Sequence, residues 1–340
     1  MPPKKKENKA ANGEAVEGED PLVFLKNYQQ FCKSIGMPIH GKVTQTLTDE
    51  EKYPVEQIII DDSFGPLGPG GTRALMTALM GSGPGMKGGP FKLLKSIRIW
   101  RSNVGDDGAA SIAEVLRLGG IDVQISYLEL LDNNISARGG LALGNSLGRH
   151  NNLSLLTLKL DYNTTLGDEG VANLCRGLRT NASLKQLHLS YCGITAEGGD
   201  ALSDVLENSR SFLEVLNLSG NKLGGPGLAK LCKGLNENTV LQKLMIADNS
   251  IDQEEEDLAA LELFKDCLMN KKLNLSSVDL MWNRIGEAGA MVLIPALGPD
   301  NTKITEFLVD LTLPMPLFEQ IFRKGGGGKK GKKGKKGKKK

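Results

Sequence analysis

The sequence predicts an α/β solenoid, in which strand–turn–helix units stack on one another along the chain. Three observations lead to this prediction. A strand–turn–helix pattern recurs along most of the 340 residues. Within each unit, apolar residues alternate first with the period of a strand and then with that of a helix. Neither half of a unit could bury its apolar side alone, so the units must stack.

The clearest unit is residues 213–235, LEVLNLSGNKLGGPGLAKLCKGL. Leu216 and Leu218 share one side of a strand, because successive side chains alternate. Asn221 follows, where its amide can satisfy backbone groups as the chain leaves the strand. Pro226 stands at a position that favours the start of a helix. The helical stripe consists of Leu228, Leu231, Cys232 and Leu235.

The same features recur in phase over about eight units, mostly 28 to 31 residues apart. The first apolar position of each unit is held by Leu94, Ile125, Leu155, Leu184, Leu213, Leu241, Leu275 and Ile304. The Asn position is held by Ser102, Asn133, Asn163, Cys192, Asn221, Asn249 and Asn283. The glycine that opens the helix recurs as Gly108, Gly139, Gly170, Gly198, Gly227 and Gly289. A weaker first unit begins near Val55, and the last unit lacks the Asn, as a terminal cap can.

These units resemble the ribonuclease-inhibitor-like leucine-rich repeats over roughly residues 55–318. The resemblance implies parallel strands on a concave side and helices on a convex side. It is specific for the fold and does not identify a function. The expected organisation is a disordered segment over 1–20, a capping helix and connection over 21–54, a solenoid of about eight to nine repeats over 55–324, and a disordered Lys/Gly tail over 325–340.

Three stretches depart from the repeat. Residues 21–35 have apolar side chains at helical spacing, which indicates a cap over the first repeat or a docking helix. Residues 36–54 are expected to be a connection. Residues 81–90, GSGPGMKGGP, match G-x-G-x-x-G formally, but they should follow a helix and precede a strand, so a flexible loop is favoured over a dinucleotide site. Residues 252–257, DQEEED, replace the usual glycine and should precede a longer helix, as a convex contact or as tolerated variation.

No catalytic or metal-binding constellation is expected. The cysteines form no CxxC pair and lie in no metal-ligand spacing with a histidine, which favours free thiols in a reducing compartment. The histidines His40, His150 and His188 are far apart and have no nucleophile motif beside them. The sequence therefore predicts a non-enzymatic protein without a cofactor.

The concave side carries the candidate binding residues. Simple alternation points strand positions 3, 5 and 7 away from the core, and position 8 follows them. Both tryptophans and three of the five tyrosines fall on these positions. Because aromatic residues and Arg anchor protein interfaces, a protein partner is expected there. The alternative is that these side chains only pack over neighbouring strands. The predicted protein-binding residues are Trp100, Arg101, Tyr127, Asp132, Asp161, Tyr162, His188, Tyr191, Asp248 and Trp282.

The chain ends in a lysine-rich tail. The whole chain carries a net charge of +2 and the tail contributes nine positive charges, which leaves −7 for the rest. Such a tail predicts salt-sensitive binding to polyanions, whether acidic protein tails such as those of tubulin, RNA or anionic lipid; a solubilising tail or a localisation signal is the alternative. The predicted polyanion-binding residues are Lys329, Lys330, Lys332, Lys333, Lys335, Lys336, Lys338, Lys339 and Lys340.

The expected function is a scaffold or adaptor that binds a protein partner. No apolar run of 18 residues exists and no apolar core follows the charged N-terminus, so the cytoplasm is the expected location. The PPKKK start and Lys-rich end are similar to those of leucine-rich-repeat subunits of the ciliary or flagellar axoneme, in radial spokes or dynein regulatory complexes. One alternative is an activator of the small GTPase Ran, which is similar in repeat type but usually has an acidic tail. Another is an RNA-associated adaptor.

Overall fold

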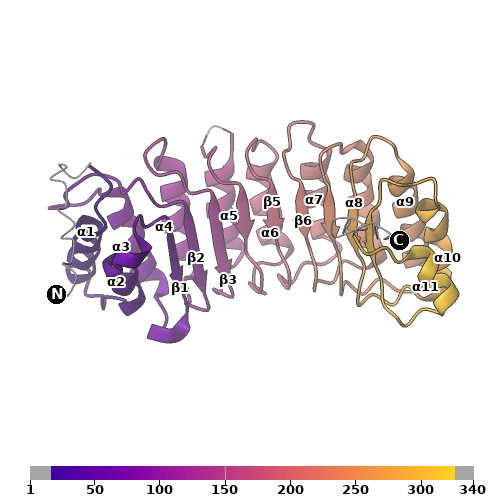
Figure 1. The fold of residues 1–340 in the computed structure, drawn as a ribbon, viewed down its shortest axis with the longest axis horizontal. Coiled ribbons are helices and arrows are strands. Elements are labelled where there is room, and N and C mark those ends of the chain that lie inside the picture. Colours follow the sequence, from indigo (N-terminus) through magenta and orange to yellow (C-terminus); the bar gives the residue numbers. More distant parts are fainter. Residues whose placement is uncertain (1–16, 150, 326–340) are drawn as a thin grey trace, which may run out of the picture.

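The computed structural model describes residues 17–149 and 151–325. In this part of the chain, nine strands form one open sheet, and each strand pairs in parallel with the next along the sequence. Each crossover between strands carries a helix. Figure 1 shows the repeats following one another along the long axis, from α1 at one end to α11 at the other. The predicted α/β solenoid is confirmed.

The elements follow the predicted period. The strands are β1 Gln57–Ile60, β2 Ser96–Trp100, β3 Tyr127–Leu131, β4 Thr157–Lys159, β5 Gln186–His188, β6 Val215–Asn217, β7 Lys243–Met245, β8 Ser277–Asp279 and β9 Glu306–Leu308. The helices between them are α3 Gly68–Met80, α4 Gly105–Leu118, α5 Ala137–Leu147, α6 Gly167–Leu178, α7 Gly198–Glu207, α8 Gly224–Glu237, α9 Glu255–Met269 and α10 Gly286–Leu293. Helices α1 Pro21–Ser34 and α2 Gly41–Thr48 precede the sheet, and α11 Met315–Ile321 follows it.

The core lies between the sheet and its helices. The strand register aligns one row of apolar side chains that are all essentially buried. This row is Ile58, Ile97, Leu128, Leu158, Leu187, Leu216, Leu244, Val278 and Phe307. Because strand side chains alternate, the residues between the buried rows point away from the helices. That second side of the sheet is the concave face.

The buried asparagines link successive repeats. The Oδ1 atom of Asn221 accepts hydrogen bonds from the backbone N–H groups of Cys192 and Ile194, at 3.0 and 3.1 Å. Its Nδ2 atom donates to the carbonyls of Leu189 and Leu218, both at 2.8 Å. One amide thus satisfies backbone groups of two repeats that would otherwise be buried without partners.

The glycine that recurs near the start of the repeat helices has a steric cause. A Cβ atom on Gly139 would lie 2.6 Å from the Cγ2 atom of Ile135, which is itself fully buried. Equivalent clashes with Val104, Leu166 and Ile194 occur at the corresponding glycines. The close packing of the turn on the helix therefore requires glycine at this position.

Both ends of the array are covered. Phe24 of α1 stacks on Phe91 with ring centroids 5.0 Å apart, and the Tyr28 hydroxyl accepts a hydrogen bond from the His40 N–H at 3.3 Å. Helix α2 lies in the stretch for which the sequence predicted only a connection, because its buried apolar residues, Val43 and Leu47, give too short a pattern. At the other end, Arg323 pairs its backbone antiparallel with β9.

Candidate functional site

The concave face of the sheet presents one aligned side chain from each strand, directly after the buried row. The register aligns these side chains as Ile59, Arg98, Glu129, Lys159, His188, Asn217, Met245, Asp279 and Leu308. Arg98, Glu129 and Lys159 alternate in charge on β2 to β4, whereas beyond β5 the charged member of this row is Asp279. The face is therefore polar and varies in charge along its length.

Strands β2 to β4 carry a cluster of side chains that contact one another. The Trp100 indole N–H donates to Glu129 Oε1 at 3.1 Å, and the Tyr127 hydroxyl donates to Glu129 Oε2 at 2.7 Å. Burial raises the Tyr127 pKa above its ordinary value, and the bond to Glu129 adds to this shift. The Arg98 guanidinium carbon lies 4.6 Å from the centre of the Tyr127 ring, and Lys159 Nζ lies 5.6 Å from it. In this cluster, packing across neighbouring strands accounts for the observed contacts.

The centre of the concave face holds Asp161 and His188. Asp161 is buried, and its Oδ1 atom accepts a hydrogen bond from the Ser190 N–H at 2.7 Å. His188 Nδ1 lies 3.5 Å from Asn217 Nδ2. Burial lowers the His188 pKa below its ordinary value, and the negative charge of Asp161 only partly opposes the shift. The Asp161 carboxylate therefore joins two adjacent repeats, which the sequence did not reveal.

A second line of residues lies directly after the strands, and we call it the rim row. Its members share one backbone conformation, with φ between 47° and 72°. They also share one hydrogen bond, because the N–H of each rim residue before the last donates to a carbonyl of the next repeat. The rim row consists of Arg101, Asp132, Tyr162, Tyr191, Gly220, Asp248 and Trp282. Of the ten predicted protein-binding residues, the structure gathers six in this row.

The rim side chains are exposed, in contrast to the strand cluster. Tyr162 and Tyr191 stack with ring centroids 4.9 Å apart and planes at 11°. Arg101 forms an ion pair with Asp62, with Nη2 and Oδ1 3.4 Å apart. Trp282 is 71% exposed at the other end of the row. The row combines rigid aromatic groups with charges at both ends, which is a composition suited to protein recognition.

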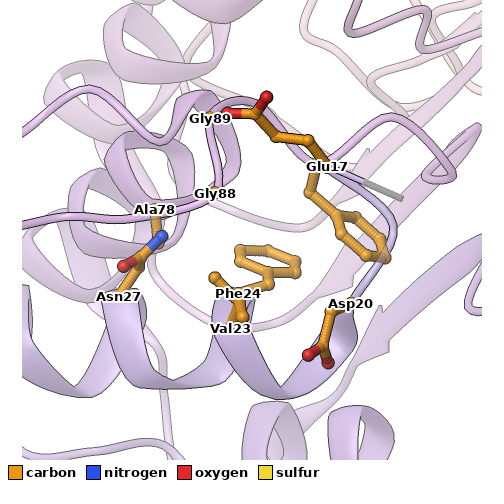
Figure 2. A pocket seen from close by; sticks show the side chains of 10 residues that line it. Glu17, Asp20, Val23, Phe24, Asn27, Ala78, Gly88 and Gly89 are labelled. Atoms are coloured by element: carbon orange, nitrogen blue, oxygen red, sulfur yellow. The ribbon is translucent and has the colours of Figure 1, made fainter. Parts of the chain in front are cut away.

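The glycine-rich segment over 81–90 packs against α1. The Asn27 side chain donates to the Lys87 carbonyl at 2.9 Å and accepts from the Lys87 N–H at 3.2 Å. Figure 2 shows the adjoining cavity of about 220 Å³, with Phe24 and Val23 on one side and Gly88 and Gly89 on another. Its charged lining residues, Glu17 and Asp20, are acidic, which is unfavourable for a phosphate group. The segment thus attaches the first helix to the repeats.

The remaining candidates have these outcomes. All five cysteines are buried free thiols, and burial raises the pKa of Cys175 and Cys192 to about 12.

Across the described residues, no group of three or more His, Cys, Asp or Glu side chains is placed to hold a metal ion. No helix in the same part of the chain has the length and apolar character needed to cross a bilayer. His150 and the nine tail lysines lie outside the described residues, so the polyanion site stays a prediction.

Comparison with known proteins follows the repeats. The family model described as Leucine Rich repeat matches residues 151–175, 180–203, 211–232 and 271–293. Ribonuclease inhibitor from Sus scrofa is 30% identical over 218 residues, which cover 63% of this chain and 44% of the relative. NACHT, LRR and PYD domains-containing protein 5 from Homo sapiens is 30% identical over 211 residues, which cover 62% of this chain and 17% of the relative. The chain thus spans less than half the length of these curated relatives.

Among solved structures, the actin-binding site 2 of leiomodin-1 is similar with a TM-score of 0.38 and 16% sequence identity, covering 47% of this chain and 86% of that one. The repeats matched by the family model coincide with strands β4 to β6 and β8 and the helices that follow them. In each matched segment, a strand is followed by a helix. The chain is therefore a solenoid built of leucine-rich repeats, and it is similar to proteins of the ribonuclease-inhibitor-like type.

Proposed function

We propose that this protein is a non-catalytic scaffold or adaptor that holds a protein partner on its concave face. The observation that carries the proposal is the rim row. Tyr162, Tyr191 and Trp282 are 49%, 39% and 71% exposed, although aromatic residues make up only 5% of the chain. Large exposed aromatic groups held in a fixed geometry are typical anchors of protein interfaces.

The repeat type supports the same proposal. Stacked repeats build an extended surface that contacts a large partner more readily than a small molecule. Two of the curated relatives are named as inhibitors of ribonuclease, that is, for an effect on another protein. A binding role is the function that such an open surface favours.

We further infer that the partner belongs to a larger cytoskeletal assembly, such as the axoneme of a cilium or flagellum. The support is the charge arrangement of the sequence, in which a body of net charge −7 is joined to a tail of nine lysines. Such a tail would add a salt-sensitive contact with acidic segments, including those of tubulin, to the contact made by the concave face.

Photocrosslinking of the full chain tests the scaffold proposal. A photoreactive phenylalanine analogue would replace Tyr162 on the rim row, and, in a matched control, Lys233 on the convex helix α8, which is also exposed. After activation in native extract at moderate salt, the expected result is a protein adduct from position 162 that is absent from position 233. Adducts of equal yield from both positions, or from 233 alone, would contradict a concave binding site.

A further inference from the structure

The rim row contains bulky side chains where the backbone disfavours them. Positive φ suits Gly, Asn and Asp, yet Tyr162, Tyr191 and Trp282 have φ of 63°, 53° and 63°. Aspartate and glycine fill the same position in other repeats, so the turn itself does not require an aromatic residue. Strained positions of this kind persist when the side chain serves a purpose other than folding.

Gly220 fixes the position of Tyr191. A Cβ atom on Gly220 would lie 2.3 Å from the Tyr191 ring, so this ring lies directly over the glycine. Tyr162 stacks on Tyr191, and the Tyr191 hydroxyl reaches Asp248 Oδ2 at 3.4 Å. The missing side chain therefore allows one tyrosine to extend across the next repeat and to form one wall of a groove.

That groove has a volume of about 480 Å³. Its lining consists of Tyr191, Asp248, Trp282, Asn283, Arg284, Asp310 and Thr312. The Asp310 side chain is held next to residue 282, because its Oδ2 atom accepts a hydrogen bond from the Trp282 backbone N–H at 2.6 Å. Arg284 is the cationic member of the lining, and no ion pair between it and either aspartate is found in the described part of the chain. Two aromatic groups and two carboxylates thus border one hollow.

The surrounding charge is negative. Asp279 lies on the concave face of the adjacent strand, and its pKa is raised, first by burial and then by the charges of Glu306 and Asp310, although Lys243 opposes this. Lys243 lies 3.7 Å from Glu306. The local carboxylates therefore outnumber the local cations, and a cation supplied from outside would relieve their repulsion.

We propose that this groove binds an arginine side chain of the protein partner, with its guanidinium group against Trp282 and its N–H groups directed at Asp248 and Asp310. A planar guanidinium stacks on an aromatic face and also donates paired hydrogen bonds to carboxylates, so it matches both parts of the lining. Lysine would satisfy the charge but not the planar contact. This inference rests on the proposed function, since it names the chemistry of the partner at one end of the concave face.

The test uses the full chain and a small probe. Acetyl-arginine amide would be titrated while the two indole N–H resonances, from Trp100 and Trp282, are followed by NMR. Acetyl-citrulline amide, which has nearly the same shape but no charge, is the matched control. The expected result is a saturable shift of the Trp282 resonance alone, with at least tenfold weaker binding of the citrulline probe. Equal binding of both probes, or a parallel shift of Trp100, would overturn the proposal.

Variants sharpen the assignment. Asp248→Asn and Asp310→Asn keep a side-chain oxygen and should each weaken binding of the arginine probe at least tenfold. Asp132→Asn, at the rim position of a repeat far from the groove, should leave the affinity for the probe unchanged. A full-length variant with the nine tail lysines changed to Gln addresses a competing occupant, because Gly325 lies beside Glu306 at this end of the face. Binding seen only in that variant would assign the groove to the chain's own tail and overturn a partner arginine.

The two proposals fail in different ways. Concave crosslinks to a partner without binding of the arginine probe would leave the scaffold function standing and remove the arginine site. Probe binding without concave crosslinks would retain a cation site and remove the scaffold interface.

Discussion

At the scale of single residues, buried amides hold neighbouring repeats together. Asn133, Asn163 and Asn221 each accept hydrogen bonds from two backbone N–H groups of the preceding repeat and donate to two carbonyls. Cys192 occupies the same position, where its thiol donates to the Leu160 carbonyl at 3.2 Å and offers little as an acceptor. This repeat junction is therefore less well satisfied than those of Asn133, Asn163 and Asn221.

Cys192→Asn should stabilise the protein by about 1 kcal/mol, because the new amide oxygen gives the buried Asn163 N–H a strong acceptor. Urea unfolding monitored by circular dichroism would measure the change. Cys175→Asn is the control: it places an amide on the buried side of α6, where burial without partners should cost roughly 1–3 kcal/mol. Destabilisation by both variants would contradict the assigned role of position 192.

His188 should make stability depend on pH. Its folded-state pKa is lowered, chiefly by burial, so the unfolded chain takes up a proton first as the pH falls below about 6.5. The free energy of unfolding is thus fully retained above that pH and decreases as the pH falls toward the folded-state pKa. NMR titration of the His188 ring should give a pKa below 6.5, and His188→Asn should reduce the slope of stability against pH in this window. A folded-state pKa above 6.5 would contradict the sign.

At the scale of elements, an aspartate at the start of one helix caps the next helix. Asp106 of α4 accepts hydrogen bonds from the Ser136 and Gly139 N–H groups of α5 at 2.8 and 2.9 Å. Asp168 of α6 makes the same contacts with Thr195 and Gly198. Burial alone would raise the Asp106 pKa, but hydrogen bonds from Ser136 and Gly139 lower it overall. These aspartates thus connect neighbouring helices.

Asp106→Ala should destabilise the protein by roughly 1–2 kcal/mol, the usual effect of losing a helix cap. Asp107→Ala is the matched control, because its ion pair with Arg138 is exposed and should contribute less than 1 kcal/mol. Hydrogen exchange of the Gly139 amide should accelerate in the first variant only. Because the Asp106 pKa is lowered in the folded state, the Asp106 carboxylate adds to the free energy of unfolding above the ordinary carboxyl pKa. This contribution disappears as the pH falls through the folded-state pKa. Equal exchange in both variants would argue against a cap between helices.

The sequence predicted strands and long helices well because their apolar periods are imposed by burial. Helix α9, Glu255–Met269, was expected because Leu261, Phe264 and Leu268 have helical spacing, and all three are buried. The reason for its acidic start was not visible. The Asp257 carboxylate accepts a hydrogen bond from the Gly225 N–H of the preceding repeat, a contact between residues 32 positions apart. Such long-range polar contacts leave no local pattern.

At the scale of the whole molecule, the array depends on its ends. The Arg323 guanidinium donates to the carbonyls of Asn301 and Ile304, both at 2.7 Å, and to Gly298 at 2.9 Å. These carbonyls belong to the last turns of the array, which have no further repeat to bond with. In a solenoid, where each repeat contacts mainly its neighbours, an unsatisfied end opens first.

Arg323→Ala should lower the local opening free energy of β9 by roughly 2–3 kcal/mol, because several carbonyls lose a charged donor. Hydrogen exchange followed by mass spectrometry should show faster exchange over residues 304–309 and no change over β4. Lys324→Ala, an exposed neighbour, is the control. Uniform acceleration along the whole sheet would instead indicate a single cooperative unit.

The candidate site was only partly readable from the sequence, for a physical reason. Alternation predicted which side chains of the strands leave the core, and the repeat alignment placed Tyr162, Tyr191 and Trp282 at one further position, directly after them. It gave no weight to Gly220, which occupies that position without a side chain and admits the Tyr191 ring. Asp310 was missed because the last repeat departs from the pattern. Aligning the rim position through every repeat, glycine included, would have revealed Gly220, whereas Asp310 stands one position before the rim position of the last repeat.

The regular spacing of the rim row determines which secondary structure of a partner can contact successive rim positions. Neighbouring strands lie about 4.8 Å apart, so the row offers one side chain at roughly that interval. A helical turn advances about 5.4 Å, which differs by about 0.6 Å, whereas two residues of an extended chain advance about 6.8 Å. The side chains of a helix laid along the row would stay opposite successive rim positions for about three turns. Those of an extended peptide would lose this match within about one repeat. The spacing of the rim row therefore matches a short helix of a partner better than an extended peptide.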